Sequence, residues 1–344
     1  MSPRSGVVLQ GVDPPPVFEG MVEEIETLGY DHLWITDSSL HARNPYAYLT
    51  LAARRSATLL LGTAVTNPVT RHPAITAAAA ATIDEISDGR MILGIGAGDR
   101  PLLALGMPPA PVEALGETVA AIRALWRDEH VTLATRSFRL EGAHVRFDTR
   151  PDIPIYIAAS GPRTLELAGS IADGVILLVG LFPEAIAWAL EHVDRGAAAA
   201  GRDRPFVTVF AYGRVAEDED EALVDARSIA AWFPQTAPAI CHLAGLSEDL
   251  VARARSAYAG GEFQEAAAAA ELLPAAFVRK VAVSGGQERT RAQIRGVLAA
   301  GADGVSVFPL GRERVETVRR FAACFRAEAR TSDIRYPAAQ AETS

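Results

Sequence analysis

Short apolar runs rich in Val, Ile and Leu alternate along the chain with longer segments whose apolar residues recur at helical spacing. Strands that alternate with helices are typical of βα units, so the pattern predicts a parallel sheet. The strands are predicted over residues 6–10, 32–36, 59–64, 91–95, 155–159, 174–179, 206–212 and 304–308. The main helices are predicted over residues 17–28, 45–56, 74–87, 112–128, 164–172, 183–200, 288–300 and 312–327.

Most of these strands are followed within a few residues by a helix start signal. The expected fold is therefore a TIM (β/α)8 barrel, which carries its site at the carboxyl ends of the strands. An open doubly wound sheet is the alternative, because periodicity alone does not distinguish closure.

Two stretches interrupt the rhythm. Residues 130–150 hold two short alternating runs, Val131–Leu133 and His144–Phe147, which predict a hairpin on the barrel rim. Residues 216–276 are rich in Ala, the best helix former, and predict a helical insertion. With both insertions included, we expect a single barrel domain over residues 1–330.

The end of the chain, residues 331–344, lacks periodicity and is expected to be frayed.

Composition narrows the class of protein. The 33 Lys and Arg against 42 Asp and Glu give a net charge of -9, which argues against nucleic acid as a partner because phosphate backbones need a basic face. No apolar run approaches the roughly 20 residues of a membrane helix, and the N-terminus does not resemble a secretion signal. Cys241 and Cys324 are expected to be buried thiols. These features predict a cytoplasmic protein without a membrane or nucleic-acid partner.

The seven histidines show no i, i+4 pair, so no metal site is predicted.

The strand over 32–36 runs directly into Asp37 and Ser38. In a barrel that end faces the active site, so Asp37 is expected to be exposed to a bound ligand. The alternative is that Asp37 only caps the following turn, a common use of Asp after a strand. Position alone leaves both interpretations open.

The strand over 59–64 continues into a polar loop closed by proline, which contains Ala64, Val65, Thr66 and Asn67. The segment has the form of a shelf under a cofactor. On its own it can equally be an ordinary βα turn, in which Asn67 closes the loop by side-chain hydrogen bonds.

A glycine-rich turn, Gly96, Ala97, Gly98 and Asp99, follows the strand over 91–95. Glycines let the backbone approach a planar ligand closely and leave amide donors free. The spacing does not match a dinucleotide fingerprint. On position alone, Asp99 is a carboxylate of the rim that faces either a bound ligand or water.

Ala159, Ser160, Gly161, Pro162 and Arg163 link a strand to a helix. The free amides at such a helix start bind anions, and an arginine adds charge-assisted hydrogen bonds. A phosphate group is therefore the expected ligand. The alternative is a plain capped helix. A second turn of this kind, over 283–287, is expected to be a simple cap, with binding of the phosphate tail or a substrate anion as the alternative.

Four segments, over residues 36–37, 61–73, 84–99 and 158–164, together resemble the motifs of the luciferase-like superfamily in the order expected there. The residues of these segments are most similar to those of its methylenetetrahydromethanopterin reductase branch. The resemblance implies a TIM barrel and a non-proline cis peptide between Ala64 and Val65, under the ring of a flavin or deazaflavin.

The resemblance also implies residue roles. It assigns Asp37, Ser38 and Asp99 to catalysis. The residues that it assigns to the cofactor are Asp37, Ala64, Val65, Thr66, Asn67, Gly96, Ala97, Gly98, Ala159, Ser160, Gly161, Pro162 and Arg163.

The chain departs from the branch at two positions, with Ser38 where a histidine is common and Val8 where an acidic residue is common. A serine hydroxyl does not titrate near neutrality as an imidazole does. The resemblance therefore implies a cofactor and a reaction class, but not the pterin substrate.

The implied cofactor is coenzyme F420, with FMN as the alternative. The implied activity is hydride transfer between reduced deazaflavin and a C=C or C=N bond of a small molecule or modified peptide, as in secondary-metabolite tailoring. The alternatives are an FMN-dependent monooxygenase and a non-catalytic flavin-binding protein. Family analogy further implies a homodimer with residues 47–53 and 77–81 in its interface.

Overall fold

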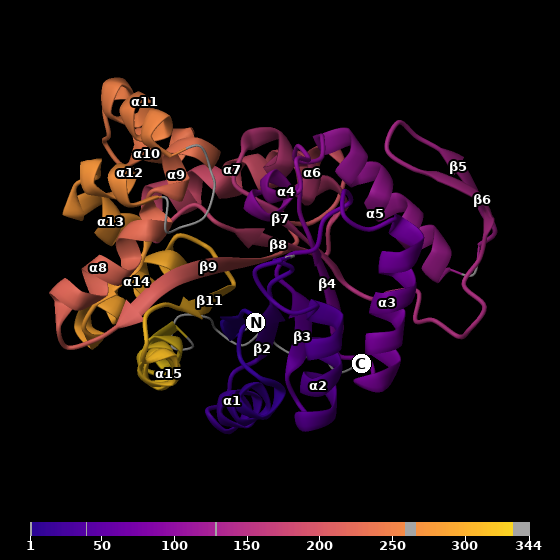
Figure 1. Ribbon diagram of the computed structural model, residues 1–344, viewed down its shortest axis with the longest axis horizontal. Coiled ribbons are helices and arrows are strands. Elements are labelled where there is room, and N and C mark those ends of the chain that lie inside the picture. The colour runs from indigo at the N-terminus through magenta and orange to yellow at the C-terminus, as the bar shows by residue number, and fades with distance from the viewer. Residues whose placement is uncertain (1, 39, 128, 259–265, 333–344) are drawn as a thin grey trace, which may run out of the picture.

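The computed structural model describes residues 2–38, 40–127, 129–258 and 266–332, which form a barrel of parallel strands surrounded by helices (Figure 1). The barrel strands in ring order are β1 (Arg4–Leu9), β2 (His32–Ile35), β3 (Leu60–Thr63), β4 (Met91–Ile95), β7 (Ile155–Ala159), β8 (Gly174–Leu177), β9 (Phe206–Val215) and β11 (Gly304–Pro309). Parallel pairing of β8 with β9 and of β11 with β1 closes the ring. The predicted TIM barrel is therefore confirmed, and the open sheet is excluded.

The outer layer consists of α1 (Pro15–Thr27), α2 (Pro45–Arg55), α3 (Pro73–Ile86), α5 (Val112–Trp126), α6 (Pro162–Ile171), α7 (Pro183–Ala199), α14 (Gln287–Ala299) and α15 (Arg314–Ser332). All eight of these helices begin within two residues of the predicted start. Several begin with a proline, whose fixed φ suits the first helical turn and whose missing N–H costs nothing there. Their apolar faces pack on the strands and form the main hydrophobic core.

A second apolar cluster fills the barrel interior. Trp34, Tyr156 and Phe210 pack there with aliphatic side chains. Gly62 leaves the space that the Trp34 ring occupies, because a Cβ at position 62 would collide with that ring. The barrel is therefore packed below its carboxyl end rather than hollow, and a ligand has room only at the mouth.

The two predicted insertions lie at opposite ends of the long axis of the molecule in Figure 1. The hairpin consists of β5 (Val131–Ala134) and β6 (Arg139–Ala143). Its second strand precedes the predicted one over 144–147, because a tight turn already brings Thr135 and Phe138 together by a hydrogen bond. The other insertion is helical, as expected, with α8 (Glu219–Ala230), α9 (Trp232–Thr236), α10 (Pro238–Leu243), α11 (Glu248–Ala257), α12 (Ala267–Leu272) and α13 (Ala275–Val281).

Three further details differ from the prediction. Residues 283–285, expected to be a turn, form the short strand β10 (Val283–Gly285), which extends the sheet beside β9. A short helix, α4 (Arg100–Ala104), follows the glycine-rich turn. Helix α15 continues to Ser332, so residues 331–332 are helical; the rest of the predicted frayed tail, 333–344, lies outside the described residues.

The apolar faces expected in a dimer interface are largely used inside the protomer. The buried residues of α2 and α3 in these ranges include Ala52, Ala53, Ala77, Ala80 and Ala81. The homodimer itself stays a prediction, and its surface on these helices would have to come from other residues.

Within the part of the chain that the structure describes, no helix is long and apolar enough to cross a membrane. Both cysteines are free and buried, as predicted.

Candidate active site

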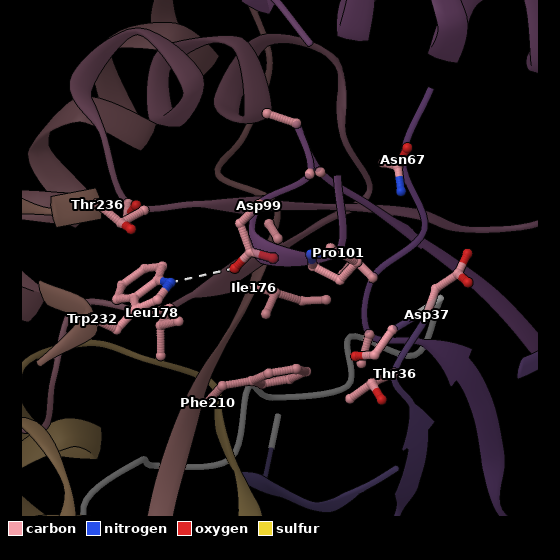
Figure 2. Close-up of a pocket in the computed structure, with 18 of the residues that line it drawn as sticks. Thr36, Asp37, Asn67, Asp99, Pro101, Ile176, Leu178, Phe210, Trp232 and Thr236 are labelled. Atoms are coloured by element: carbon pink, nitrogen blue, oxygen red, sulfur yellow. Dashed lines mark hydrogen bonds between the residues drawn. The ribbon is translucent and has the colours of Figure 1, made fainter. Parts of the chain in front are cut away.

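A cavity of about 620 Å³ opens at the carboxyl ends of the barrel strands (Figure 2). Each of the four strand-end segments noted in the sequence contributes to its wall. The lining residues from these segments are Thr36, Asp37, Ser38, Ala64, Val65, Asn67, Gly96, Ala97, Gly98, Asp99, Ala158, Ala159, Ser160, Gly161 and Thr164. The structure thus brings together most of the residues singled out from the sequence, and leaves Thr66, Pro162 and Arg163 outside the cavity lining.

The Asp37 side chain is buried and bonded to other residues of the chain, whereas the sequence predicted that it is exposed to a bound ligand. Its side chain is 1% exposed and forms an ion pair with Arg71, whose Nη2 donates to Oδ1 at 3.1 Å and whose Nη1 donates to Oδ2. Thr66 Oγ1 also donates to Oδ2, at 2.9 Å. A buried carboxylate needs such partners to keep its charge. Asp37 therefore forms part of the pocket wall, with its charge compensated by Arg71.

Arg71 itself is held by Tyr46, over whose ring its guanidinium carbon lies 5.2 Å from the centroid. Burial raises the pKa of Tyr46 to about 12, so the phenol stays neutral. Arg71 lies in the segment over residues 61–73, but its role in the site was not predicted from the sequence. Its partner lies 34 residues away, and no local pattern shows that pairing.

The peptide bond between Ala64 and Val65 is cis, at the position that the resemblance indicates. Beyond it the chain returns to the sheet, where Thr66 N donates to Gly94 O at 3.0 Å and Gly96 N donates to Thr66 O at 2.9 Å. The Gly96 amide is thus used within the protein and is not a free donor for a ligand.

The glycines of this turn serve close packing of the protein on itself. A Cβ at Gly94 would collide with the Thr63 carbonyl oxygen, and one at Gly96 would lie 3.0 Å from Val65 Cγ2. Gly98 has a φ of 86°, in the left-handed region that favours glycine. Gly94 and Gly96 therefore fit the turn against the end of β3, while Gly96 also lines the cavity, so the close approach of a ligand at this turn stays a prediction.

Asn67 supports the turn interpretation of its loop. Its Oδ1 accepts hydrogen bonds from Val69 N at 3.0 Å and Thr70 N at 2.9 Å. Ala64 and Val65, half-buried, are the residues of this segment that present apolar surface to the cavity.

Asp99 lies on the other side of the cavity, half-buried, and its Oδ2 accepts a hydrogen bond from Trp232 Nε1 at 3.3 Å (Figure 2). Trp232 and Thr236 belong to α9 of the helical insertion and line the cavity with Asp99. The sequence indicated only an alanine-rich helical segment here, so this contribution was missed. A lone tryptophan in such a segment is a weak signal that could have found it.

The cavity floor is apolar and aromatic. Ile176, Leu178 and Phe210 line it below the two carboxylates (Figure 2). Tyr212 and Phe308 add a stacked pair whose ring centroids are 4.6 Å apart. These strand residues fit a planar apolar ligand.

Helix α6 begins at the cavity edge, where Ser160, Gly161 and Thr164 line the wall. A Cβ at Gly161 would meet nothing within 4 Å, so space is open at this helix start. Its first amides point along the axis without intrahelical partners, an arrangement that binds anions. Arg163 is exposed and lies outside the lining.

The second turn, ahead of α14, lies beside a carboxylate of the chain itself, that of Glu219. Glu219 accepts hydrogen bonds from Arg279 Nη1 at 3.0 Å and Arg289 Nη2 at 3.1 Å, and lies 3.5 Å from Gly286 N. The N-cap residue of α14 is Gly286, which has no side chain to form a cap, so the predicted simple cap is replaced by this contact with Glu219 of α8.

In the described part of the chain, no group of three or more His, Cys, Asp or Glu side chains is arranged to hold a metal ion.

A closed barrel with a ligand cavity at the carboxyl ends of its strands defines a TIM-barrel protein with a small-molecule site. The chain belongs to the luciferase-like monooxygenase family, whose model matches residues 4–304. The resemblance inferred from the four motifs is thereby confirmed.

Relatives of known name support the branch. A 5,10-methylenetetrahydromethanopterin reductase of Archaeoglobus fulgidus is 36% identical over 244 residues, which cover 70% of this chain and 73% of the relative. The enzyme of the same name from Methanopyrus kandleri is 30% identical over 338 residues, covering 91% and 95%. The solved structure of the coenzyme F420-dependent tetrahydromethanopterin reductase from Methanopyrus kandleri superposes with a TM-score of 0.82 at 26% identity and covers 94% of this chain and 98% of that one.

Proposed function

We propose that this chain is a coenzyme F420-dependent oxidoreductase that transfers a hydride between the reduced deazaflavin and a C=C or C=N bond of a small molecule or modified peptide. The observation that carries the proposal is the shape of the cavity: an apolar shelf at Ala64 and Val65 leads to the open start of α6. A deazaflavin cofactor has a planar ring, which packs on an apolar surface, and an anionic tail, which binds at a helix start. It therefore needs these two elements in one cavity. The similarity to the coenzyme F420-dependent reductase from Methanopyrus kandleri supports the choice of cofactor.

The residues present fit this cofactor. A volume of about 620 Å³ lies within the usual range of ligand sites, about 300–1,000 Å³. Ala64, Val65 and Ala97 would contact the ring. Ser160, together with the first amides of α6, would hold the phosphate of the tail, because a helix start favours negative charge.

When bound, the deazaflavin supplies hydride chemistry at a ring carbon. The chain's own residues would orient the substrate against the ring and exclude water. Phe210 and Ile176 provide the apolar surface for this, while the Ser38 hydroxyl and the Asp99 carboxylate offer hydrogen-bond partners at the cavity wall. Asp37 acts through the wall that it forms with Arg71, as a positioning residue.

Titration of the purified protein with oxidised and reduced coenzyme F420, followed by the fluorescence of the deazaflavin, tests the proposal. We expect binding of both forms. Thr164→Glu places a negative charge at the α6 start and should weaken binding at least about tenfold by repulsion of the tail phosphate.

The matched control is Ser137→Glu, which adds the same charge on the exposed turn of the hairpin and should bind like the parent protein. No affinity of the parent for either redox form would end the proposal. Tight binding of FMN in its place, with oxygen uptake driven by NADH, would favour the monooxygenase alternative. Binding of F420 with every property unchanged in Asp99→Ala except stability would favour a non-catalytic protein.

A further inference from the structure

The charges around the cavity are unequal, and this inequality bears on the substrate. Among the lining residues that the structure describes there is no lysine or arginine, and His41 is the one basic side chain. Asp37 and Asp99 are the acidic ones. A cavity wall of one sign selects ligands of the opposite sign or of none.

The two carboxylates differ in how their charge is compensated. Asp37 is 1% exposed and pairs with the guanidinium of Arg71 through both oxygens. Among the described residues, Asp99 receives one side-chain hydrogen bond, from the neutral indole of Trp232 at 3.3 Å. An N–H donor fixes the direction of a carboxylate without neutralising it. Asp99 therefore leaves its negative charge facing the cavity.

One aromatic ring contacts this carboxylate, and others line the same cavity. Trp232 belongs to the same hydrogen bond, Phe210 lies across the cavity in Figure 2, and Tyr212 stacks on Phe308 at 4.6 Å in the same lining. The faces of such rings attract cations, most strongly where water is excluded. A carboxylate with aromatic neighbours is the arrangement that recognises an ammonium or iminium nitrogen on an apolar body.

We propose that Asp99, held by Trp232, selects substrates that carry a cationic nitrogen next to the group to be reduced or oxidised, and that the cavity rejects phosphorylated and carboxylated substrates at this end. The proposal rests on the proposed function for the reaction itself. The charge preference is a property of the wall, however, and can be measured without turnover.

The test uses three small probes of similar size and different charge: benzyltrimethylammonium, benzyl alcohol and benzoate. Their dissociation constants are measured by ligand-observed NMR, with the protein alone and with the protein holding oxidised coenzyme F420. We expect the ammonium probe to bind at least about tenfold more tightly than benzoate, with the alcohol between them. Asp99→Asn keeps the shape and should remove most of this preference, leaving the smaller contribution of the aromatic rings.

Trp232→Phe keeps the ring and removes the indole N–H, so part of the preference should be lost while the ring contribution remains. Asp203→Asn is the matched control, because it removes the same charge from an exposed loop before β9, at the opposite end of the barrel. It should retain the full preference. Thermal unfolding of each variant, with its affinity for F420, shows that the fold is kept.

Equal affinity of the parent for the ammonium and benzoate probes would overturn the proposal, as would a preference that is undiminished in Asp99→Asn. These outcomes are independent of the cofactor titration: loss of F420 binding would contradict the proposed function while the probe ratio still reports on Asp99.

Discussion

The two sides of the cavity use the same side-chain chemistry in different ways. On the side of β2 and β3, Asp37 is enclosed by Arg71 and Thr66 and its charge is satisfied within the protein. On the side of β4, the one hydrogen bond that Asp99 accepts from a described side chain comes from an indole of a helix outside the barrel. The comparison teaches that one carboxylate maintains the shape of the site, whereas the other is placed to act on what enters it.

Breaking the ion pair on the β2 side should have the largest effect. Arg71→Leu leaves a carboxylate buried without its cation, and we expect the free energy of unfolding to fall by roughly 3–5 kcal/mol. The measurement is urea denaturation near neutral pH. Asp99→Asn, on the other side, should change it by less than about 0.5 kcal/mol, as surface-type substitutions do.

The double variant Asp37→Asn with Arg71→Leu distinguishes a buried charge from lost packing. It should regain part of the stability, since no ion is then left unpaired. A single variant that is as stable as the parent would mean that Asp37 is not held by Arg71, and the contrast between the two sides would disappear.

The second effect concerns the shelf. Gly94→Ala adds a methyl group against the Thr63 carbonyl, a backbone group that cannot turn aside, and should cost about 1–3 kcal/mol. F420 affinity should fall with it, because Val65 packs on the same glycine. Calorimetric unfolding and the cofactor titration provide the two readouts.

Gly116→Ala is the control for this substitution. Gly116 lies in the interior of α5, where a Cβ would meet Leu167 Cδ1 at an ordinary 3.4 Å, so alanine should stabilise the helix by about 0.5–1 kcal/mol. If Gly94→Ala behaved like this control, the glycine would not be needed for packing against β3.

The same contrast explains what the sequence could and could not predict. Apolar runs bounded by helix starts located all eight barrel strands, because burial on both faces leaves a strong local pattern. The three-residue β10 was missed because Val283–Gly285 is too short to show one. The lining residues at strand ends were found since barrel topology fixes where such ends meet. Arg71 and Trp232 were not assigned, because their partners lie 34 and 133 residues away and only folding brings them together.

The third effect concerns a buried polar group outside both sides of the cavity, and it is seen only in acid. His32 is 2% exposed and stacks on Trp34 with ring centroids 5.4 Å apart, and its Nε2 has no hydrogen-bond partner among the described residues. Burial, with the nearby Arg4 as a lesser cause, lowers the pKa of His32 from 6.5 to about 3. Unlike Asp37, this group has no partner of opposite charge, so it is stable inside only while neutral.

Between these two pKa values the unfolded chain binds a proton that the folded chain does not, so acid favours unfolding. The stabilising contribution is complete above pH 6.5 and is lost as the pH falls, by up to roughly 1.4 kcal/mol per pH unit, until about pH 3. His32→Gln cannot titrate, so its free energy of unfolding should fall less steeply between these limits, as urea denaturation at a series of pH values measures. Parallel curves for the variant and the parent would show that His32 takes up its proton in the folded state, and that an unpaired buried group at this end of the barrel tolerates charge as well as the paired Asp37 does.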